Sequence, residues 1–388
     1  MDPEERFYSR NSVNINLFIV AGALLVLYQY RYGLGVINPV NDNWLMKHDW
    51  ATHYLGWFFY RNEPWVFPIG NISNYLYPVG TNIGFTDSIP LAAIFFKVFS
   101  PILPHHFQYI GLWLFGCHLL LAFFTTKLFE QFSVKGLAQL FAALIVVLNP
   151  VLLYRSIHPA LCSHWIIVGC LWVYFLDPAK YTPTRIIIYQ GIFFIAGALI
   201  NPYLSLIGAG FFVATAWRLW YFDKSVKFTK VLGLSALTFS IVAILWFVIG
   251  FFSFKTRTDL GVTGAYGLYA FNLNSLFNSS GWSAFFGQRP MVSWHQYESF
   301  MYLGVGMIAL IIVVLLLSLW RRFHPGITSD EKKSQARINL TPLSVFVIFI
   351  SLFAITHVVT FDDKVLLTVH LNSRVLKVFD IFRASARY

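Results

Sequence analysis

The sequence predicts an all-α integral membrane protein, on the evidence of its charge content, its aromatic content and its apolar segments. Of the 388 residues, 57% are hydrophobic and 12% are charged, whereas a soluble domain carries about twice that share of charge. Aromatic residues make up 19%, which suits the interface belts of a bilayer. Long apolar segments recur, and about 20 such residues cross a bilayer as a helix. We predict about nine transmembrane helices plus juxtamembrane amphipathic helices in the first outer loop.

Other classes of protein are disfavoured by the charge pattern and by missing motifs. The formal net charge is +11, but no basic run with interleaved aromatic residues indicates a nucleic-acid partner. Cys117, Cys162 and Cys170 all lie in apolar segments, so we expect them to pack rather than to form disulfides. The sequence contains no Walker motif, GxSxG, CxxC pair or HExxH, so nucleotide-dependent chemistry is not supported.

A single transmembrane domain over residues 1–388 is expected, because no linker or low-complexity segment divides the chain. The first span, at 14–36, follows a short polar N-terminus and is interpreted as an anchor. In the outer loop at 38–104, the segment 88–104 is predicted to be juxtamembrane or re-entrant, since Lys97 and three prolines interrupt it. A helix bundle at 107–253, a second outer loop at 254–299, the last spans at 300–360 and an amphipathic outer tail at 361–388 complete the chain. Further spans are expected at 107–129, 136–153, 161–177, 185–200, 203–221, 230–253, 300–320 and 342–360, with a tight turn or helix break at Asn201-Pro202.

The positive charges predict the orientation. With the N-terminus in the cytoplasm, 15 Lys and Arg residues fall in inner segments and eight fall outside before residue 360, as the positive-inside rule requires. Counting 88–104 as a full span would invert everything after it and remove this agreement. Both long loops are therefore expected on the outer side of the membrane.

The stretch from His48 to Arg61 is predicted to be an amphipathic helix that organises the candidate site. Asp49 and His53 lie one helical turn apart on its polar side. The helix is expected to lie flat on the membrane with its rings toward lipid, the rings being Trp50, Tyr54, Trp57 and Phe58. Asp49 could then be a general base, because partial desolvation raises a carboxylate's pKa, and His53 could orient it or share a metal. The alternative is a solvated polar face without chemistry.

Two further segments carry candidate groups. Asp87 precedes an apolar helix, where it could bind substrate hydroxyls or a cation, or simply cap that helix. Arg155, with His158 and His164, lies in an outer connection, and an arginine at a membrane boundary favours an anion such as the phosphate of a lipid head group. The alternative is a snorkelling arginine beside two helix-end histidines.

Polar residues elsewhere on the outer side are candidates for substrate binding. Asn201 and Tyr203 would line the cavity, or only punctuate a helix. Gln296 and Glu298 follow a polar, uncharged loop typical of hydrogen bonding to sugars, although an acid at a helix start is also favoured by the helix dipole. If the first loop folds back, Asp49, His53 and Asp87 could hold one divalent cation.

Several motifs together resemble a family of uncharacterised bacterial multi-pass membrane proteins grouped with the C-type glycosyltransferase superfamily (GT-C). The matching stretches run through nearly the whole chain in order: HDWATHYLGWFFYRNEPW, YPVGTNIGFTDSIPLAAIFFKVFSPILP, FQYIGLWLFGCHLLLAFF, RSIHPALCSHW, LINPYLSL, HQYESFMYLG and FRASARY. Two departures are noted. His48 stands where the family commonly has glycine, and relatives continue with further spans beyond FRASARY, so this chain is expected to be C-terminally truncated.

The resemblance implies a glycosyltransferase of the cell envelope in the bacterial inner membrane. GT-C enzymes transfer sugars from polyprenyl-phosphate donors to a glycan or lipid acceptor on the periplasmic or outer side. By position in the motif, Asp49 would be the acidic residue that acts as base or metal ligand, Asp87 a second acidic site, and Arg155 a candidate for the lipid phosphate. The alternatives are a transporter or flippase of lipid-linked glycans, which would use the same cavity for binding only, or an inactive truncated member of the family.

Overall fold

The computed structural model describes residues 3–252, 266–324, 338–382 and 384–388. The chain groups into two compact units, and each is described by itself. The first comprises Met1–Leu148, Tyr154–Thr256 and Thr341–Leu343, and the second comprises Asn149–Leu153, Arg257–Leu340 and Ser344–Tyr388. Part of the predicted second outer loop and of the inner connection before the last span lies outside the described residues. The prediction of one transmembrane domain stays a prediction.

Six helices in the described residues are long and apolar enough to cross a membrane, which is consistent with a multi-pass membrane protein. They are Val13–Arg31, Ile110–Gln131, Leu137–Ile157, Pro183–Ile200, Phe228–Ile249 and Val305–Phe323. The predicted count of nine is not confirmed, because three expected spans contain shorter helices. These are α7 (Trp165–Tyr174), α9 (Pro202–Trp217) and α12 (Thr341–Ile355).

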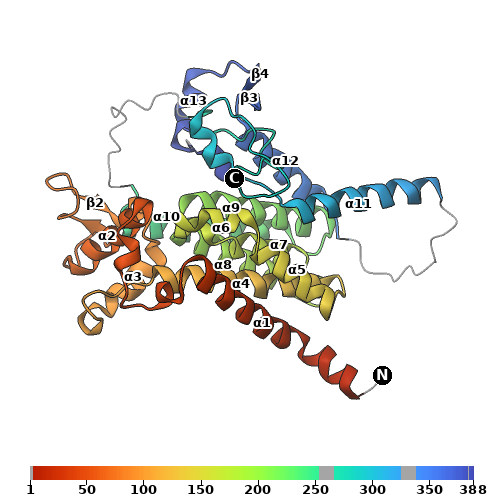
Figure 1. Cartoon of the computed structure of the whole chain (residues 1–388), viewed down its shortest axis with the longest axis horizontal. Helices are drawn as coiled ribbons and strands as arrows, with labels where there is room; N and C mark the ends of the chain where they lie inside the picture. The colour runs from red at the N-terminus through yellow and green to blue at the C-terminus, as the bar shows by residue number, and fades with distance from the viewer. Residues whose placement is uncertain (1–2, 253–265, 325–337, 383) are drawn as a thin grey trace. The chain divides into compact units, whose positions relative to one another are not determined.

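Helices dominate the first unit (Figure 1). In addition to α7 and α9 they are α1 (Pro3–Arg31), α2 (His48–Asn62), α3 (Pro90–Val98), α4 (Ile110–Gln131), α5 (Leu137–Val147), α8 (Pro183–Ile200) and α10 (Phe228–Ile249). Helix α4 packs against α1, α5 and α7, while α8 packs against α7, α9 and α10. Small residues allow this close packing: a Cβ added to Gly208 of α9 would lie 2.9 Å from Cα of Phe194 in α8. The predicted break at Asn201 is confirmed, since its extended backbone (φ −161°) separates α8 from α9.

The first loop is fixed to the end of α10. The short strands β1 (Asn71–Ile72) and β2 (Thr81–Asn82) pair antiparallel. Just before them, the backbone N–H groups of Ile69 and Gly70 donate to the carbonyls of Val248 and Ile249. The side chain of Asn82 donates to the same Ile249 carbonyl at 2.7 Å. Because the last carbonyls of a helix lack partners within it, the first loop acts as the C-terminal cap of α10.

Helix α2 forms within one residue of its predicted bounds, but its aromatic side chains do not all face outward. Trp57 is fully buried and Tyr54 is 4% exposed. The indole of Trp57 packs on Phe107 and Tyr109 and donates to the carbonyl of Phe107. The prediction that these two rings contact lipid is therefore wrong, because Tyr54 donates to Asp42 in the first loop and the segment just before α4 covers Trp57.

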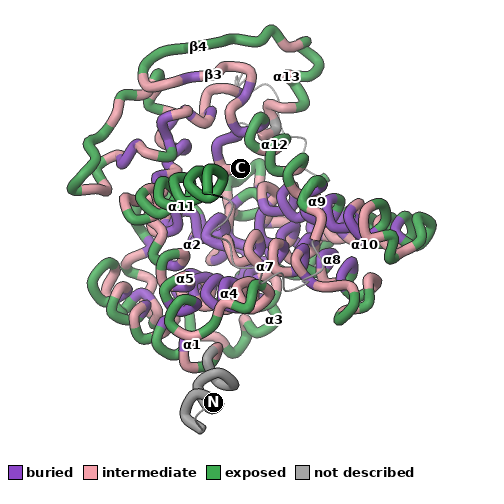
Figure 2. The backbone as a smooth tube through the Cα atoms, turned by 90° about the vertical axis from the view of Figure 1, so that its right-hand side faces the viewer, coloured by how far each residue is buried: buried purple, intermediate pink, exposed green. Residues whose placement is uncertain are grey.

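The second unit contains one long helix and a short hairpin. Its helices are α6 (Pro150–Tyr154, of which Tyr154 belongs to the first unit), α11 (Val305–Phe323), most of α12 and α13 (Ser373–Phe379). The predicted amphipathic tail contains β4 (Lys364–Thr368), which pairs with β3 (Val358–Phe361) before α13 begins. Helix α11 has no buried residue (Figure 2). A helix that faces lipid needs apolar side chains on its exposed surface, and α11 meets this requirement.

Candidate functional site

The site begins where α2 lies against the turn at 86–88, and Gly56 permits this contact. A Cβ added to Gly56 would lie 2.3 Å from Ser88 Oγ and 2.5 Å from Thr86 Cβ. The Ser88 hydroxyl donates to the backbone carbonyl of His53 at 2.6 Å, and Tyr109 donates to the carbonyl of Ser88. These contacts hold the turn that carries Asp87 against α2, and Asp87 Oδ2 lies 3.9 Å from His53 Nδ1.

Asp87 adopts an unusual backbone conformation. Its φ is 57°, and that of Ile89 is 56°, in the left-handed region that side chains other than glycine rarely occupy. The alternative that Asp87 caps the next helix is wrong, since the N-cap of α3 is Ile89 and no side chain caps it. Asp87 Oδ1 instead accepts a hydrogen bond from Asn201 Nδ2 at 2.9 Å. The strained turn thus presents its carboxylate to other parts of the first unit.

A second pair of contacts brings the turn at 155–158 to α2. The Trp50 indole donates to the carbonyl of Ser156 at 2.8 Å, and His53 Nε2 lies 2.9 Å from the carbonyl oxygen of Ile157. His158, the next residue, therefore faces α2. Its Nε2 lies 3.7 Å from Asp49 Oδ2 and its Nδ1 lies 3.9 Å from Asp87 Oδ2.

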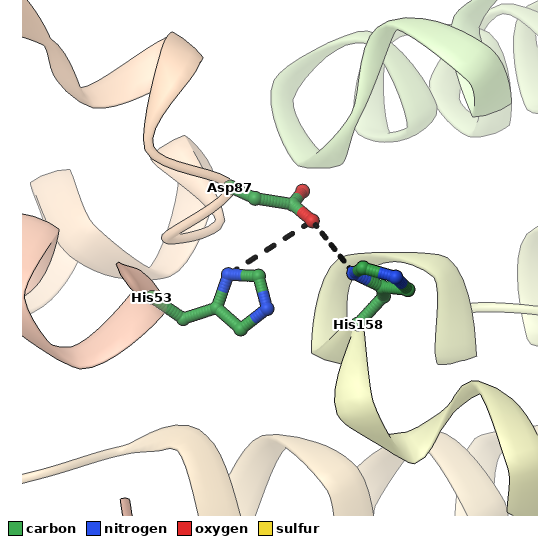
Figure 3. A group of neighbouring side chains, drawn as sticks. All are labelled: His53, Asp87 and His158. Carbon is green, nitrogen blue, oxygen red and sulfur yellow. Dashed lines mark ion pairs between the residues drawn. The ribbon is translucent and has the colours of Figure 1, made fainter. Parts of the chain in front are cut away.

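His53, Asp87 and His158 form the centre of the site (Figure 3). His53 Nδ1 and His158 Nδ1 each lie 3.9 Å from Asp87 Oδ2, and the three atoms lie within 4.8 Å of one another. Both histidines are buried, whereas 56% of the Asp49 side chain is exposed. The cluster could hold a cation, and the exposed Asp49 carboxylate lies beside it.

The other predicted site residues have different environments. Arg155 is 3% exposed, and its charge interacts with His164, which is half-buried in the same unit. Tyr203 is also half-buried, and its backbone N–H donates to the Asn201 side chain. Asn201 is the predicted cavity residue that the structure brings to the cluster.

Gln296 and Glu298 belong to the second unit, where both have structural partners. Glu298 is 1% exposed and accepts two hydrogen bonds from Arg387, at 2.6 and 3.1 Å. Gln296 donates to Thr360 and accepts from Asn272. The alternative of a surface acid at a helix start is wrong for Glu298, since its carboxylate is buried.

Sequence reasoning grouped His158 with Arg155 and missed its contacts with Asp49 and Asp87. It predicted that Trp50 would face lipid and gave Ser88 no contact with α2, whereas both residues fix the turns around the cluster. The sequence did contain a signal for these contacts, because the predicted topology placed His158 and Asp49 on the same side of the membrane. His48, which stands where the resembled family commonly has glycine, adopts a φ of 50°, so the turn before Asp49 keeps a conformation that favours glycine.

Near the cluster's helix lies a buried lysine held by aromatic rings. Lys97 Nζ lies 3.9 Å from the ring centre of Tyr60 and 4.6 Å from that of Trp65. Burial lowers the pKa of Lys97 to about 8, although the nearby Glu63 raises it. Lys97, which was predicted to interrupt the apolar segment 88–104, is therefore enclosed by aromatic rings of the first loop.

The comparisons with known proteins give a family. Residues 19–388 match the family described as a domain of unknown function, DUF6311. The chain belongs to the DUF6311 family. The DUF6311 match includes α2, the turn carrying Asp87 and the turn carrying His158. No curated protein and no solved structure matches the chain.

Proposed function

We propose that this DUF6311 protein is a membrane glycosyltransferase that uses a polyprenyl-phosphate sugar as donor. The observation that carries the proposal is the half-exposed Asp49 carboxylate beside the buried cluster of His53, Asp87 and His158. Apolar helices long enough to cross a membrane lie in the same unit, so a lipid-linked substrate can reach such a site. The resemblance to GT-C enzymes supports the same function.

In the proposed reaction, Asp49 is the general base. It takes the proton from an acceptor hydroxyl as the acceptor oxygen bonds to the anomeric carbon of the sugar. The bond from that carbon to the phosphate oxygen breaks, and its electron pair leaves with the polyprenyl phosphate. Asp49 suits this role because an acceptor can reach its exposed carboxylate, while the buried His158 ring lies 3.7 Å from the same carboxylate.

Negative charge develops on the departing phosphate, so a cation near it contributes most to catalysis. Arg155 lies three residues before His158 and is almost fully buried. A charge in a medium of low dielectric acts on its neighbours more strongly than one in water. We assign Arg155 this electrostatic role. In this proposal the N-terminus lies in the cytoplasm, and the reaction takes place on the periplasmic side of the inner membrane.

The test is release of polyprenyl phosphate by the purified full chain. The protein in lipid nanodiscs is incubated with a panel of polyprenyl-phosphate hexoses and a lipid extract as acceptor, and the products are measured by mass spectrometry. Asp49→Asn is expected to lower the rate by about 10²–10⁴-fold, the usual contribution of a general base. Asp363→Asn, which changes an exposed carboxylate in the second unit, is the matched control and should leave the rate unchanged.

Two outcomes would contradict the proposal. Full activity in Asp49→Asn would remove Asp49 as the base. Binding of the donor by the wild-type protein without release of polyprenyl phosphate from any donor would favour the alternative, a transporter or flippase of lipid-linked glycans.

A further inference from the structure

We infer that His53 Nδ1, Asp87 Oδ2 and His158 Nδ1 form a binding site for one Zn²⁺-type divalent cation. Metal binding can be measured without any substrate, so this inference does not depend on the proposed glycosyl transfer. It differs from the set predicted from sequence, because Asp49 lies outside the ligand set and His158 takes its place.

The first argument is the tautomer of His53. A carbonyl oxygen can only accept, so the 2.9 Å contact with Ile157 requires a proton on Nε2 of His53. In the neutral ring, Nδ1 then carries a lone pair. This Nδ1 is buried, has no hydrogen-bond partner in the described part of the chain, and faces Asp87 Oδ2 at 3.9 Å. A lone pair and a carboxylate oxygen that face each other repel, and a positive species between them turns this repulsion into attraction.

The second argument is that two of the candidate ligands, His53 and Asp87, are hydrogen-bonded on the atom that faces away from the common point, and that the third has a carboxylate near its other ring nitrogen. His53 Nε2 donates to the Ile157 carbonyl, and Asp87 Oδ1 accepts from Asn201. His158 Nε2 faces Asp49 Oδ2 at 3.7 Å. Metal-bound histidines are characteristically oriented in this way by a carbonyl or a carboxylate on the second ring nitrogen. Asp49 would therefore orient His158 rather than bind the metal, once the 3.7 Å separation closes to a hydrogen bond.

The third argument is the spacing of the donor atoms. In a tetrahedral zinc site with bonds of about 2.0–2.1 Å, neighbouring ligand atoms lie about 3.3–3.4 Å apart. The two Nδ1-to-Oδ2 distances here are 3.9 Å, so each of these two pairs must close by roughly half an ångström. The ligand atoms of the three residues all lie within 4.8 Å of one another, so the two imidazoles must approach by at most about 1.4 Å. Side-chain rotation supplies such a movement while Gly56 and the 86–88 turn keep the backbone in place.

The donor set selects the class of ion. Ca²⁺ and Mg²⁺ prefer oxygen ligands, whereas two imidazoles and a carboxylate suit Zn²⁺ and similar ions. Three protein ligands also leave one position for water or a substrate oxygen, as catalytic zinc sites do. A proton shared between the histidines and Asp87 would satisfy the same electrostatics, and this is the competing explanation that the test must separate.

The experiment measures zinc binding by the full chain in detergent after removal of metals with EDTA. Titration with ZnCl₂, followed by calorimetry and by elemental analysis after desalting, is expected to give about one zinc per chain. His158→Gln and Asp87→Asn should each abolish this binding or weaken it by at least tenfold. His106→Gln is the matched control, because His106 pairs with Asp42 outside the cluster.

A fourth variant separates loss of the site from loss of the fold. Asn201 also caps α9 by accepting from the Tyr203 N–H, and serine keeps that cap but cannot reach Asp87. Asn201→Ser is expected to weaken zinc binding by about 10–100-fold, as changes around metal ligands do, with an unchanged thermal unfolding temperature.

Equal zinc binding by the wild type, His158→Gln and Asp87→Asn, or none in the wild type, would overturn the inference in favour of the shared proton. Zinc binding without glycosyl transfer would retain the metal site and reject the proposed function.

Discussion

His53 Nε2 lies 2.9 Å from the carbonyl oxygen of Ile157, although 104 positions separate the two residues. Three positions before His53, Trp50 makes a second bond to the same turn. The loop before α4 and the connection that follows α5 are thus joined at the point where the candidate chemistry lies. A substitution that destabilises either of these two segments should therefore disturb the candidate site that they form together.

Gly56→Ala is expected to destabilise the first unit, because the added Cβ would overlap Ser88 and Thr86. Overpacking of this kind costs about 1–3 kcal/mol, so the thermal unfolding temperature in detergent should fall. Gly116→Ala is the matched control, since Gly116 lies in α4 and an added Cβ there meets nothing within 4 Å. Equal unfolding temperatures for the two variants would contradict the close approach of α2 to the 86–88 turn.

Lys97 should make stability depend on pH in an alkaline window. Burial lowers its pKa in the folded protein to about 8, whereas an unfolded lysine titrates near 10.4. Between these values the unfolded chain binds the extra proton, so the contribution of Lys97 to stability rises with pH. Unfolding temperatures of the wild type and Lys97→Met, measured from pH 7 to 10, should diverge in favour of the wild type above about pH 8.

The exposed Lys135 provides the control for that series. Lys135→Met should follow the wild type across the whole pH range, since its ammonium is in water in both states. A pH-independent difference between the wild type and Lys97→Met would show that Lys97 keeps an ordinary pKa.

Asp362 should give the second unit an acid-sensitive contact. It accepts from Arg289 at 2.5 and 2.8 Å and from Asn274 at 2.8 Å, and the Arg289 hydrogen bonds lower its pKa to about 2. Its contribution is fully present above the unfolded pKa of about 4 and is lost as the pH falls toward 2. Hydrogen exchange of the β3–β4 hairpin at pH 6 and pH 3 should show this loss in the wild type. Asp362→Asn should abolish it, and the neighbouring Asp363→Asn should not.

Arg387 neutralises the buried carboxylate of Glu298, so its loss should be costly. Removing one partner of a buried ion pair destabilises by about 3–5 kcal/mol, since the other charge stays uncompensated. Arg387→Ala should therefore expose the second unit to proteolysis at much lower protease concentration than the wild type. Arg374→Ala, at an exposed position in α13, should behave like the wild type, and equal resistance of both variants would contradict a buried pair.

Local pattern was sufficient to predict α2 but not the surfaces that it contacts. The spacing of Asp49 and His53 and the apolar periodicity predict a helix, and α2 begins at His48 as expected. The same pattern cannot tell whether a ring meets lipid or protein, and Trp57 packs on Phe107 and Tyr109. Burial of a side chain depends on a segment 50 positions away, which periodicity does not contain.

The candidate site was predicted in part for the same reason. Asp49, His53 and Asp87 were identified from adjacent motifs in one loop, whereas His158 enters through contacts with the distant turn at 155–158. The prediction for Asn201 was that it lines a cavity, and its amide contacts Asp87. For the spans, length and hydropathy identify six helices in the part of the chain that the structure describes, while α7 and α12 lie in shorter apolar helices and α9 has 16 residues.

The hydrogen bonds from Ile69 and Gly70 to the end of α10 also set an order of assembly. Ribosomes make the chain from its N-terminus, so these bonds cannot form until residues 248 and 249 have been synthesised. The contacts of Asp87 with His158 and Asn201 likewise wait for later segments. The first loop therefore reaches its final conformation only after most of the first unit has been synthesised, and a nascent chain interrupted before α10 would leave this loop without the helix end that it caps.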